Sequence, residues 1–173
     1  MKQRKERIFH HVIISVFCKP HDVREDVLKG LDILSPVPTA TLLAQDPIQD
    51  PERPRTTHFH MPDIELTTQD TDTDEGRMTI FTLYFRKMSA VNSFARVLRD
   101  AMTDDERTVF REDPQTMLDA EGKLSCRFDK DLLMTGKVVI TDDGSCYQVK
   151  ASVAAYPKTE KRILEALESL LDS

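Results

Sequence analysis

The sequence predicts an α+β fold, in which helices pack on a mostly antiparallel β-sheet. Residues 146–155 alternate between apolar and polar side chains, as a strand with one buried face does. The Asp-Asp-Gly run at 142–144 is typical of a tight turn between antiparallel strands. Amphipathic stretches with helical spacing separate the strand-like segments, and this order favours an antiparallel sheet covered by helices.

The chain opens with a predicted strand and helix. Residues 8–17 are rich in β-branched and aromatic side chains on both alternating faces, so we expect a central strand covered on both faces. Asp22 is placed to cap a helix over residues 23–34, which carry an apolar stripe. Pro36 stops that helix because proline lacks a backbone N–H.

A strand, a loop and a hairpin are predicted next. Residues 39–44 fit a short strand, and three prolines within residues 45–56 predict an exposed, Pro-rich loop. Residues 57–67 and 77–86 have the composition and alternation of two paired strands. The acidic run 68–76 between them is then the hairpin loop.

Two helices follow the hairpin. Ser89 is a suitable cap for a helix that extends to about Met102 and carries an apolar stripe. Thr103 opens a second helix whose first turn holds three acidic residues, where the helix dipole favours them. Pro114 breaks this helix or restarts it as a short one that ends near Gly122.

The last part of the chain contains three predicted strands and a closing helix. Residues 123–128 alternate as a strand, and a helical turn after them ends at Gly136. Residues 137–141 and 146–155 are expected to be the strands that flank the Asp-Asp-Gly turn. Residues 158–171 have the apolar spacing of an amphipathic helix.

Length and composition predict one folded domain over residues 1–173, with a basic tail at residues 1–7. The chain is 39% hydrophobic and 31% charged, which is typical of a globular protein. No apolar run reaches the roughly 18 to 20 residues that span a bilayer, so no membrane is expected. The three cysteines are odd in number and far apart, which favours reduced thiols in the cytoplasm.

The net charge of −6 is concentrated in one place. Residues 61–76 contain six acidic residues and no basic one, a number equal to the whole net charge. The rest of the chain is therefore neutral. Proteins that bind nucleic acid mainly by neutralising phosphates usually have a basic excess, so the sequence counts against tight, non-specific binding of duplexes.

Neither of two possible metal motifs is complete. Asp70, Asp72 and Asp74 have the spacing that opens a calcium loop, but the required glycine and the final glutamate are missing. His58 and His60 are two positions apart and share one face of a strand, yet no spaced cysteine accompanies them. We therefore expect no metal, and more ordinary surface or half-buried roles for these residues.

Catalytic motifs are also missing, so no cofactor and no enzymatic activity are expected. The three cysteines lie in or beside predicted strands, where cysteine is often a small buried apolar residue. There is no Gly-x-Ser-x-Gly elbow, no P-loop and no Gly-x-Gly-x-x-Gly fingerprint.

The candidate binding residues are basic ones that the predicted sheet can bring together. They are Arg86, Lys87, Arg127, Lys130, Lys137 and Lys150. Contacts from such residues would be to phosphates. The alternative is that they are ordinary solvated charges, balanced by neighbours such as Asp129 and Asp131.

Two segments and the closing helix resemble a known archaeal family. Residues 124–138 read LSCRFDKDLLMTGKV, and residues 147–157 read YQVKASVAAYP. An Arg-x-Asp-Lys element before a glycine and a strand, followed by an alternating strand that ends in Tyr-Pro, is similar to the family described as predicted exosome subunits or RNA-binding proteins. The chain departs from that family at residues 131–133, where Asp-Leu-Leu replaces the common Gln-Ala-Ala.

The resemblance implies an α+β fold similar to the large-subunit ribosomal protein that binds 5S RNA. It also implies an archaeal, cytoplasmic protein with RNA as a partner and exosome components as possible further partners. Our first hypothesis is a non-catalytic RNA-binding accessory protein. The alternatives are a protein-interaction module, including a homodimer, and a metal-dependent enzyme that uses His58 and His60.

Overall fold

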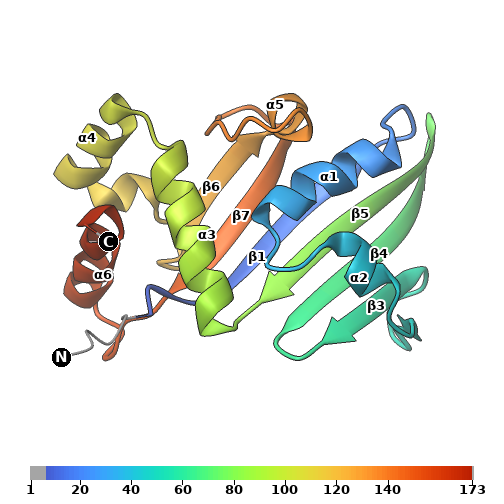
Figure 1. Ribbon diagram of the computed structural model, residues 1–173, viewed down its shortest axis with the longest axis horizontal. Coiled ribbons are helices and arrows are strands. Elements are labelled where there is room, and N and C mark those ends of the chain that lie inside the picture. The colour runs from blue at the N-terminus through green and yellow to red at the C-terminus, as the bar shows by residue number, and fades with distance from the viewer. Residues whose placement is uncertain (1–6, 173) are drawn as a thin grey trace.

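Among the described residues, seven antiparallel strands form one sheet in the order β2–β3–β4–β5–β1–β7–β6. The computed structural model describes residues 7–172, and Figure 1 shows the helices packed across the sheet. The strands are β1 Phe9–Cys18, β2 Ile48–Gln49, β3 Thr56–Met61, β4 Ile64–Thr73, β5 Gly76–Phe85, β6 Leu124–Asp129 and β7 Cys146–Val153. The helices are α1 Arg24–Leu34, α2 Thr39–Leu43, α3 Met88–Ala101, α4 Asp104–Glu112, the 3-10 helix η1 Pro114–Met117, α5 Lys130–Met134 and α6 Glu160–Asp172. The predicted α+β class is confirmed.

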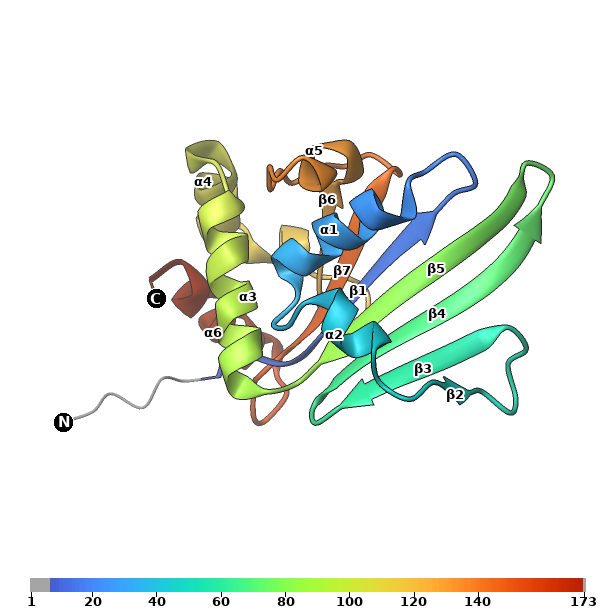
Figure 2. The same ribbon diagram turned by 45° about the vertical axis from the view of Figure 1, so that its right-hand side comes forward.

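The first strand is central, but only one of its faces is covered. β1 pairs with β5 on one side and β7 on the other. Val12 and Ile14 are fully buried under the helices, whereas Phe17 on the opposite face is 48% exposed. The expectation of cover on both faces is wrong because the helices pack on one side of the sheet, as the two views in Figures 1 and 2 show. We call the other side the open face.

Alternation along the neighbouring strands places polar residues on the open face. On β7 the apolar residues Tyr147 and Val149 are fully buried, while Gln148 and Lys150, which alternate with them, point the other way. The same period of two occurs on β6, where Cys126 and its apolar neighbours are buried beneath the helices. The open face is therefore a broad, mixed polar and aromatic surface.

The predicted hairpin is a three-stranded meander. Residues 57–67 contain most of β3 and the start of β4, because the chain reverses at Asp63, which has a φ of 63°. The acidic run predicted as the loop 68–76 instead extends β4 as far as Thr73, paired throughout with β5. Threonines alternate with the acids here and favour a strand. The reversal is confined to the residues before Gly76, whose φ is 126°.

Cross-strand partners hold the acidic part of β4. The Thr79 hydroxyl donates a hydrogen bond of 2.7 Å to Asp70 Oδ1. Arg55 Nη1 lies 2.7 Å from Asp72 Oδ2. These contacts offset the mutual repulsion of the carboxylates and explain why a highly charged segment remains in a sheet.

Residues 39–44 form helix α2 and not the predicted strand. Asp32 Oδ1 accepts a 2.7 Å hydrogen bond from the backbone N–H of Thr39, which satisfies one of the free donors of the helix start. The Pro-rich segment 45–56 is mostly loop, as expected, except for the two residues of β2, which pair with β3.

Residues 137–141 follow β6 without forming a regular strand. The N–H of Asp129 donates to Val139 O at 2.8 Å, and the N–H of Thr141 donates to Arg127 O at 2.9 Å. Only one isolated bridge results, between Phe128 and Ile140. The predicted strand is wrong because these residues leave α5 at Gly136 and meet β6 over too short a length to build a ladder.

The helix boundaries test the predicted caps. Thr103 caps α4, as the sequence predicts, and the structure adds a capping box with Glu106. Ser89 caps nothing, since α3 already begins at Met88. Asp22 does not cap α1, because Val23 is the N-cap and the Asp22 carboxylate accepts from the N–H of Lys19 at 2.8 Å. Within residues 7–172, no helix combines the length and apolar character that crossing a membrane requires.

Candidate nucleic-acid interface

Lys130 is buried, so it does not belong to any surface patch. Its side chain is 6% exposed, and Nζ donates to Phe17 O at 2.7 Å and to Asp22 Oδ2. Burial on its own would raise the pKa of Asp22, but its hydrogen bonds with Lys130 and the Lys19 N–H prevail and lower it. Lys130 therefore fastens α5 to the β1–α1 corner, and the prediction that it contacts RNA does not fit this position.

Arg127 and Lys150 lie together on the open face. Arg127 is opposite Gln148 in the β6–β7 register, and Lys150 is opposite Ser125, so the two cations are diagonal neighbours. Arg127 Nη1 donates to Asp142 O at 3.3 Å, and Lys150 Nζ lies 3.6 Å from Asp119 Oδ2. Both residues are exposed, so their charges face solvent.

A third cation, Lys123, accompanies this pair and was missed in the sequence. Lys123 is two and four positions before Ser125 and Arg127, so strand alternation places it on the same face as these residues. This spacing is the sequence signal that could have identified it. The Lys123 charge also acts on β1, which lies beyond β7 in the sheet: burial lowers the pKa of His11, and Lys123 lowers it further. We call Lys123, Arg127 and Lys150 the basic edge of the open face.

The other predicted cations lie elsewhere. Arg86 and Lys87 follow β5 at a corner where the Arg7 guanidinium donates to the Arg86 carbonyl oxygen. Arg86 Nε lies 2.7 Å from Asp63 Oδ1, and this contact raises the pKa of Arg86. Lys137 is exposed on the segment outside β6. Residues 1–6 of the predicted basic tail lie outside the described residues.

Aromatic rings accompany the cations on the open face and at its margin. The His11 and Tyr84 rings have centroids 5.5 Å apart on neighbouring strands. Phe17 is half exposed on the same face, and Tyr156, just beyond β7, is 94% exposed. Rings that share a face with basic side chains are a means of stacking with unpaired bases.

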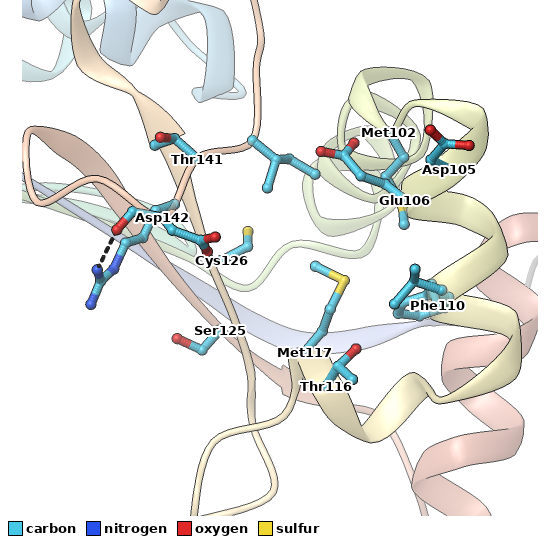
Figure 3. Close-up of a pocket in the computed structure, with 13 residues that line it drawn as sticks. Met102, Asp105, Glu106, Phe110, Thr116, Met117, Ser125, Cys126, Thr141 and Asp142 are labelled. Carbon is cyan, nitrogen blue, oxygen red and sulfur yellow. Dashed lines mark hydrogen bonds between the residues drawn. The ribbon is translucent and has the colours of Figure 1, made fainter.

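A groove of about 940 Å³ lies between α4 and β6 (Figure 3). Its floor is apolar and includes Met117 and Cys126, whereas Asp105, Glu106 and Asp142 bring carboxylates to its rim. Arg127 is its only basic lining residue among those described. Negative charge at the rim repels phosphate, so this groove does not suit a nucleic-acid backbone.

The thiols are poor nucleophiles. Burial raises the pKa of Cys126 to about 12, and it also raises the pKa of Cys18 and of Cys146. Each stays a thiol near neutral pH.

Two histidines and a glutamate gather at the opposite side of the open face. His58 Nδ1 lies 2.6 Å from Glu65 Oε1, and His58 Nε2 lies 2.9 Å from Asp50 Oδ2. The hydrogen bond with His58 is the largest of the effects that lower the pKa of Asp50, and the same bond raises the pKa of His58. One ligand atom from each of His58, His60 and Glu65 lies within 4.8 Å of the others. The sequence suggested the two histidines, but not the glutamate.

A family model described as RNA binding matches residues 11–154. The chain belongs to this RNA-binding family. The match spans β1 to the end of β7, and therefore includes the basic edge. No curated protein matches the chain.

Solved structures of archaeal proteins share the fold of this family member. A DUF54 protein from Archaeoglobus fulgidus superposes with a TM-score of 0.66 at 18% identity, covering 94% of this chain and 99% of its own. A DUF54 protein from Methanothermobacter thermautotrophicus superposes with a TM-score of 0.64 at 15% identity, covering 95% of this chain and 98% of its own. A DUF54 protein from Sulfolobus solfataricus superposes with a TM-score of 0.57 at 14% identity, covering 94% of this chain and 97% of its own. The likeness to a 5S RNA-binding ribosomal protein stays a prediction.

Proposed function

We propose that the protein binds RNA, without catalysing a reaction on it, through the open face of its sheet. The observation that carries the proposal is the match of residues 11–154 to the RNA-binding family. The surface supports it, because the three cations of the basic edge lie on the side of the sheet that the helices leave free. They would contact phosphates, which position a nucleic acid without reading its sequence.

The rings favour unpaired nucleotides over a plain duplex. Phe17 on β1 and Tyr84 on β5 offer flat surfaces on the same face as the cations, and every base has a face that stacks on such a ring. The overall net charge of −6 also opposes tight binding of any polyanion. RNA loops and single-stranded ends are therefore the targets that suit this surface.

Mobility shifts at two salt concentrations test the proposal. We expect salt-sensitive binding of a stem-loop RNA, weakened by the pair of substitutions Arg127→Glu and Lys150→Glu. The slope of log affinity against log salt should fall by about one for each phosphate that the protein no longer neutralises. Lys29→Glu with Arg96→Glu is the matched control, because it reverses two exposed charges on α1 and α3, on the covered side.

Each result has a definite meaning. Equal weakening by both pairs of substitutions would show that binding depends only on total charge and would contradict a site on the open face. Absence of salt-sensitive binding at micromolar protein would contradict RNA binding itself.

We further propose that this activity serves RNA processing in the cytoplasm of an archaeon, with exosome components as partners. The archaeal relatives of the fold and the three free cysteines support this setting. Purification of a tagged protein, with and without ribonuclease, tests it. Exosome subunits should co-purify, and their absence under both conditions would contradict the proposal.

The groove between α4 and β6 favours a second function, the binding of a partner protein. Its apolar floor and acidic rim suit a segment with apolar and basic side chains. Asp105→Lys should weaken such a complex while RNA binding stays unchanged. If RNA binding falls instead and no protein partner is found, the groove has no separate role.

A further inference from the structure

His58, His60 and Glu65 come together because of strand alternation and register. His58 and His60 are two positions apart on β3, so both point to the open face. On β4, Glu65 is directly opposite His60, and Thr67 is opposite His58. Two adjacent strands therefore present two imidazoles and one carboxylate from neighbouring positions.

The distances between these groups fit a shared cation. His58 Nδ1 lies 2.6 Å from Glu65 Oε1, and His60 Nδ1 lies 3.5 Å from Glu65 Oε2. The two imidazole rings are nearly parallel, at 13°, with centroids 6.0 Å apart. One ligand atom from each residue falls within 4.8 Å of the other two. Tetrahedral ligands bound at about 2.1 Å lie roughly 3.4 Å apart, so small side-chain rotations would bring all three atoms into range of one zinc ion.

Asp50 supports a metal site independently of the ligand distances, because it orients the His58 ring. Its Oδ2 lies 2.9 Å from His58 Nε2, on the side of the ring that faces away from Glu65. Asp50 is itself fixed, since its Oδ1 accepts from the backbone N–H groups of Glu52 and Arg53. A carboxylate that accepts from one ring nitrogen holds the proton there and leaves the other nitrogen free to bind a metal.

We propose that His58, His60 and Glu65 bind a divalent transition-metal ion, with zinc as the best match, and that Asp50 orients His58. Two imidazole nitrogens and one carboxylate oxygen are a common zinc donor set, and water would complete the coordination. Calcium and magnesium prefer oxygen donors only, so they suit this set less well.

The proposed metal site lies far from the basic edge, although Glu65 pairs with Tyr84 on the same open face. β3 and β6 are five strand spacings apart in the sheet, which is about 24 Å. Failure of one proposal therefore leaves the other intact. The competing occupant is a proton: a protonated His58 that donates to both Asp50 and Glu65 would also account for the two short distances.

Calorimetric titration of the chelator-treated, full-length protein with zinc chloride tests the proposal. We expect one equivalent to bind, and cobalt(II) to give the visible absorption of a low-symmetry site. His60→Ala and Glu65→Gln should each abolish this binding, and glutamine keeps the shape of the side chain so that β4 is preserved. Asp50→Asn should weaken the affinity by roughly 10- to 100-fold, as loss of an orienting carboxylate does.

His10→Ala is the matched control. His10 is an exposed histidine on β1, three strand spacings or about 14 Å from β3. The His10→Ala variant should bind zinc with the same affinity and stoichiometry as the unchanged protein. The proposal is overturned if the unchanged protein binds no zinc, if binding survives both His60→Ala and Glu65→Gln, or if His10→Ala reduces it equally. Circular dichroism of each variant checks that the fold is kept.

Discussion

At the residue scale, the ion pair between Lys130 and Asp22 joins segments that are 108 positions apart in the chain. Both side chains are largely withdrawn from water, at 6% and 12% exposure. A buried charge that loses its partner is costly, because desolvation is no longer offset by attraction. The pair therefore has a structural role, and removing one member should be felt in stability and not in RNA binding.

Lys130→Met should lower the free energy of unfolding by about 3 kcal/mol, because it leaves the Asp22 carboxylate buried without its cation. Denaturant unfolding measures this change. Combining it with Asp22→Asn should restore part of the loss, since no unpaired charge then remains. Affinity for RNA should stay unchanged in Lys130→Met, and a marked loss of affinity in a folded variant would contradict the structural role.

The pH dependence of this pair has a definite sign. The pKa of Asp22 is lowered in the folded protein, so its contribution to stability is present above the ordinary value of 3.8. The contribution is lost as the pH falls through the lowered pKa. The stability advantage of the unchanged protein over Asp22→Asn should therefore shrink in acid below that value. An advantage that grows in acid would contradict this assignment.

The cysteines should differ in reactivity. At pH 8, a thiol reagent should modify the half-buried Cys146 first, whereas Cys126, whose pKa is raised to about 12 by burial, should react only on unfolding. Denaturant should expose three thiols. Cys146→Ser should remove the fastest phase, and rapid modification of Cys126 in the native protein would contradict its burial.

At the scale of elements, α1 approaches the sheet closely at one glycine. The Tyr147 hydroxyl of β7 donates a 2.7 Å hydrogen bond to the Val27 carbonyl of α1. A Cβ added to Gly30 would lie 2.6 Å from Tyr147 Cζ, and closer still to its hydroxyl oxygen. Helix α1 can pack against the Tyr147 ring only because Gly30 carries no side chain.

Gly30→Ala should therefore destabilise the protein by about 1–3 kcal/mol, in spite of the better helix propensity of alanine. Tyr147→Phe should cost about 1 kcal/mol because its hydrogen bond to Val27 is removed. The double variant should be more stable than the sum of the two losses predicts, because removing the hydroxyl opens space for the new methyl group. If the stability losses measured by thermal unfolding are additive, the two positions are not energetically coupled, and the predicted steric conflict between Gly30→Ala and the Tyr147 hydroxyl is wrong.

The elements also show what the sequence could predict. Strands β1, β5 and β7 have long, regular alternation, and Thr103 with Glu106 forms a local capping pattern, so both were predictable. Residues 39–44 are too short to separate a strand from a helix by periodicity, and the contact that supports helix α2 comes from Asp32. The burial of Lys130 depends on a distant partner, and the Glu65 contribution to the histidine cluster depends on register. Neither has a local signal.

At the scale of the whole molecule, both edges of the sheet are protected. β2 at one edge has two residues and is flanked by Pro47 and Pro51. At the other edge, residues 139 and 141 already bond to the backbone of β6. Short and covered edges discourage pairing with another sheet.

We therefore expect a monomer in solution, with a mass near 19.8 kDa by light scattering coupled to size exclusion. Replacing Pro47 and Pro51 by threonine should favour self-association, because it restores backbone donors beside β2. A dimer of the unchanged protein would contradict protection of the edges and would favour the interaction-module alternative.

The acidic hairpin of β4 and β5 makes the charge distribution of the molecule asymmetric. The six carboxylates of residues 61–76, equal in number to the net charge, lie on β4 and in the turns at its two ends, while the basic edge lies on and beside β6 and β7 at the other side of the sheet. A polyanion that diffuses toward the protein is repelled by the first side and attracted by the second. We therefore expect the protein to present its β6 side to an approaching RNA before any contact forms, so that the acidic hairpin would bias the orientation of the encounter without touching a nucleotide.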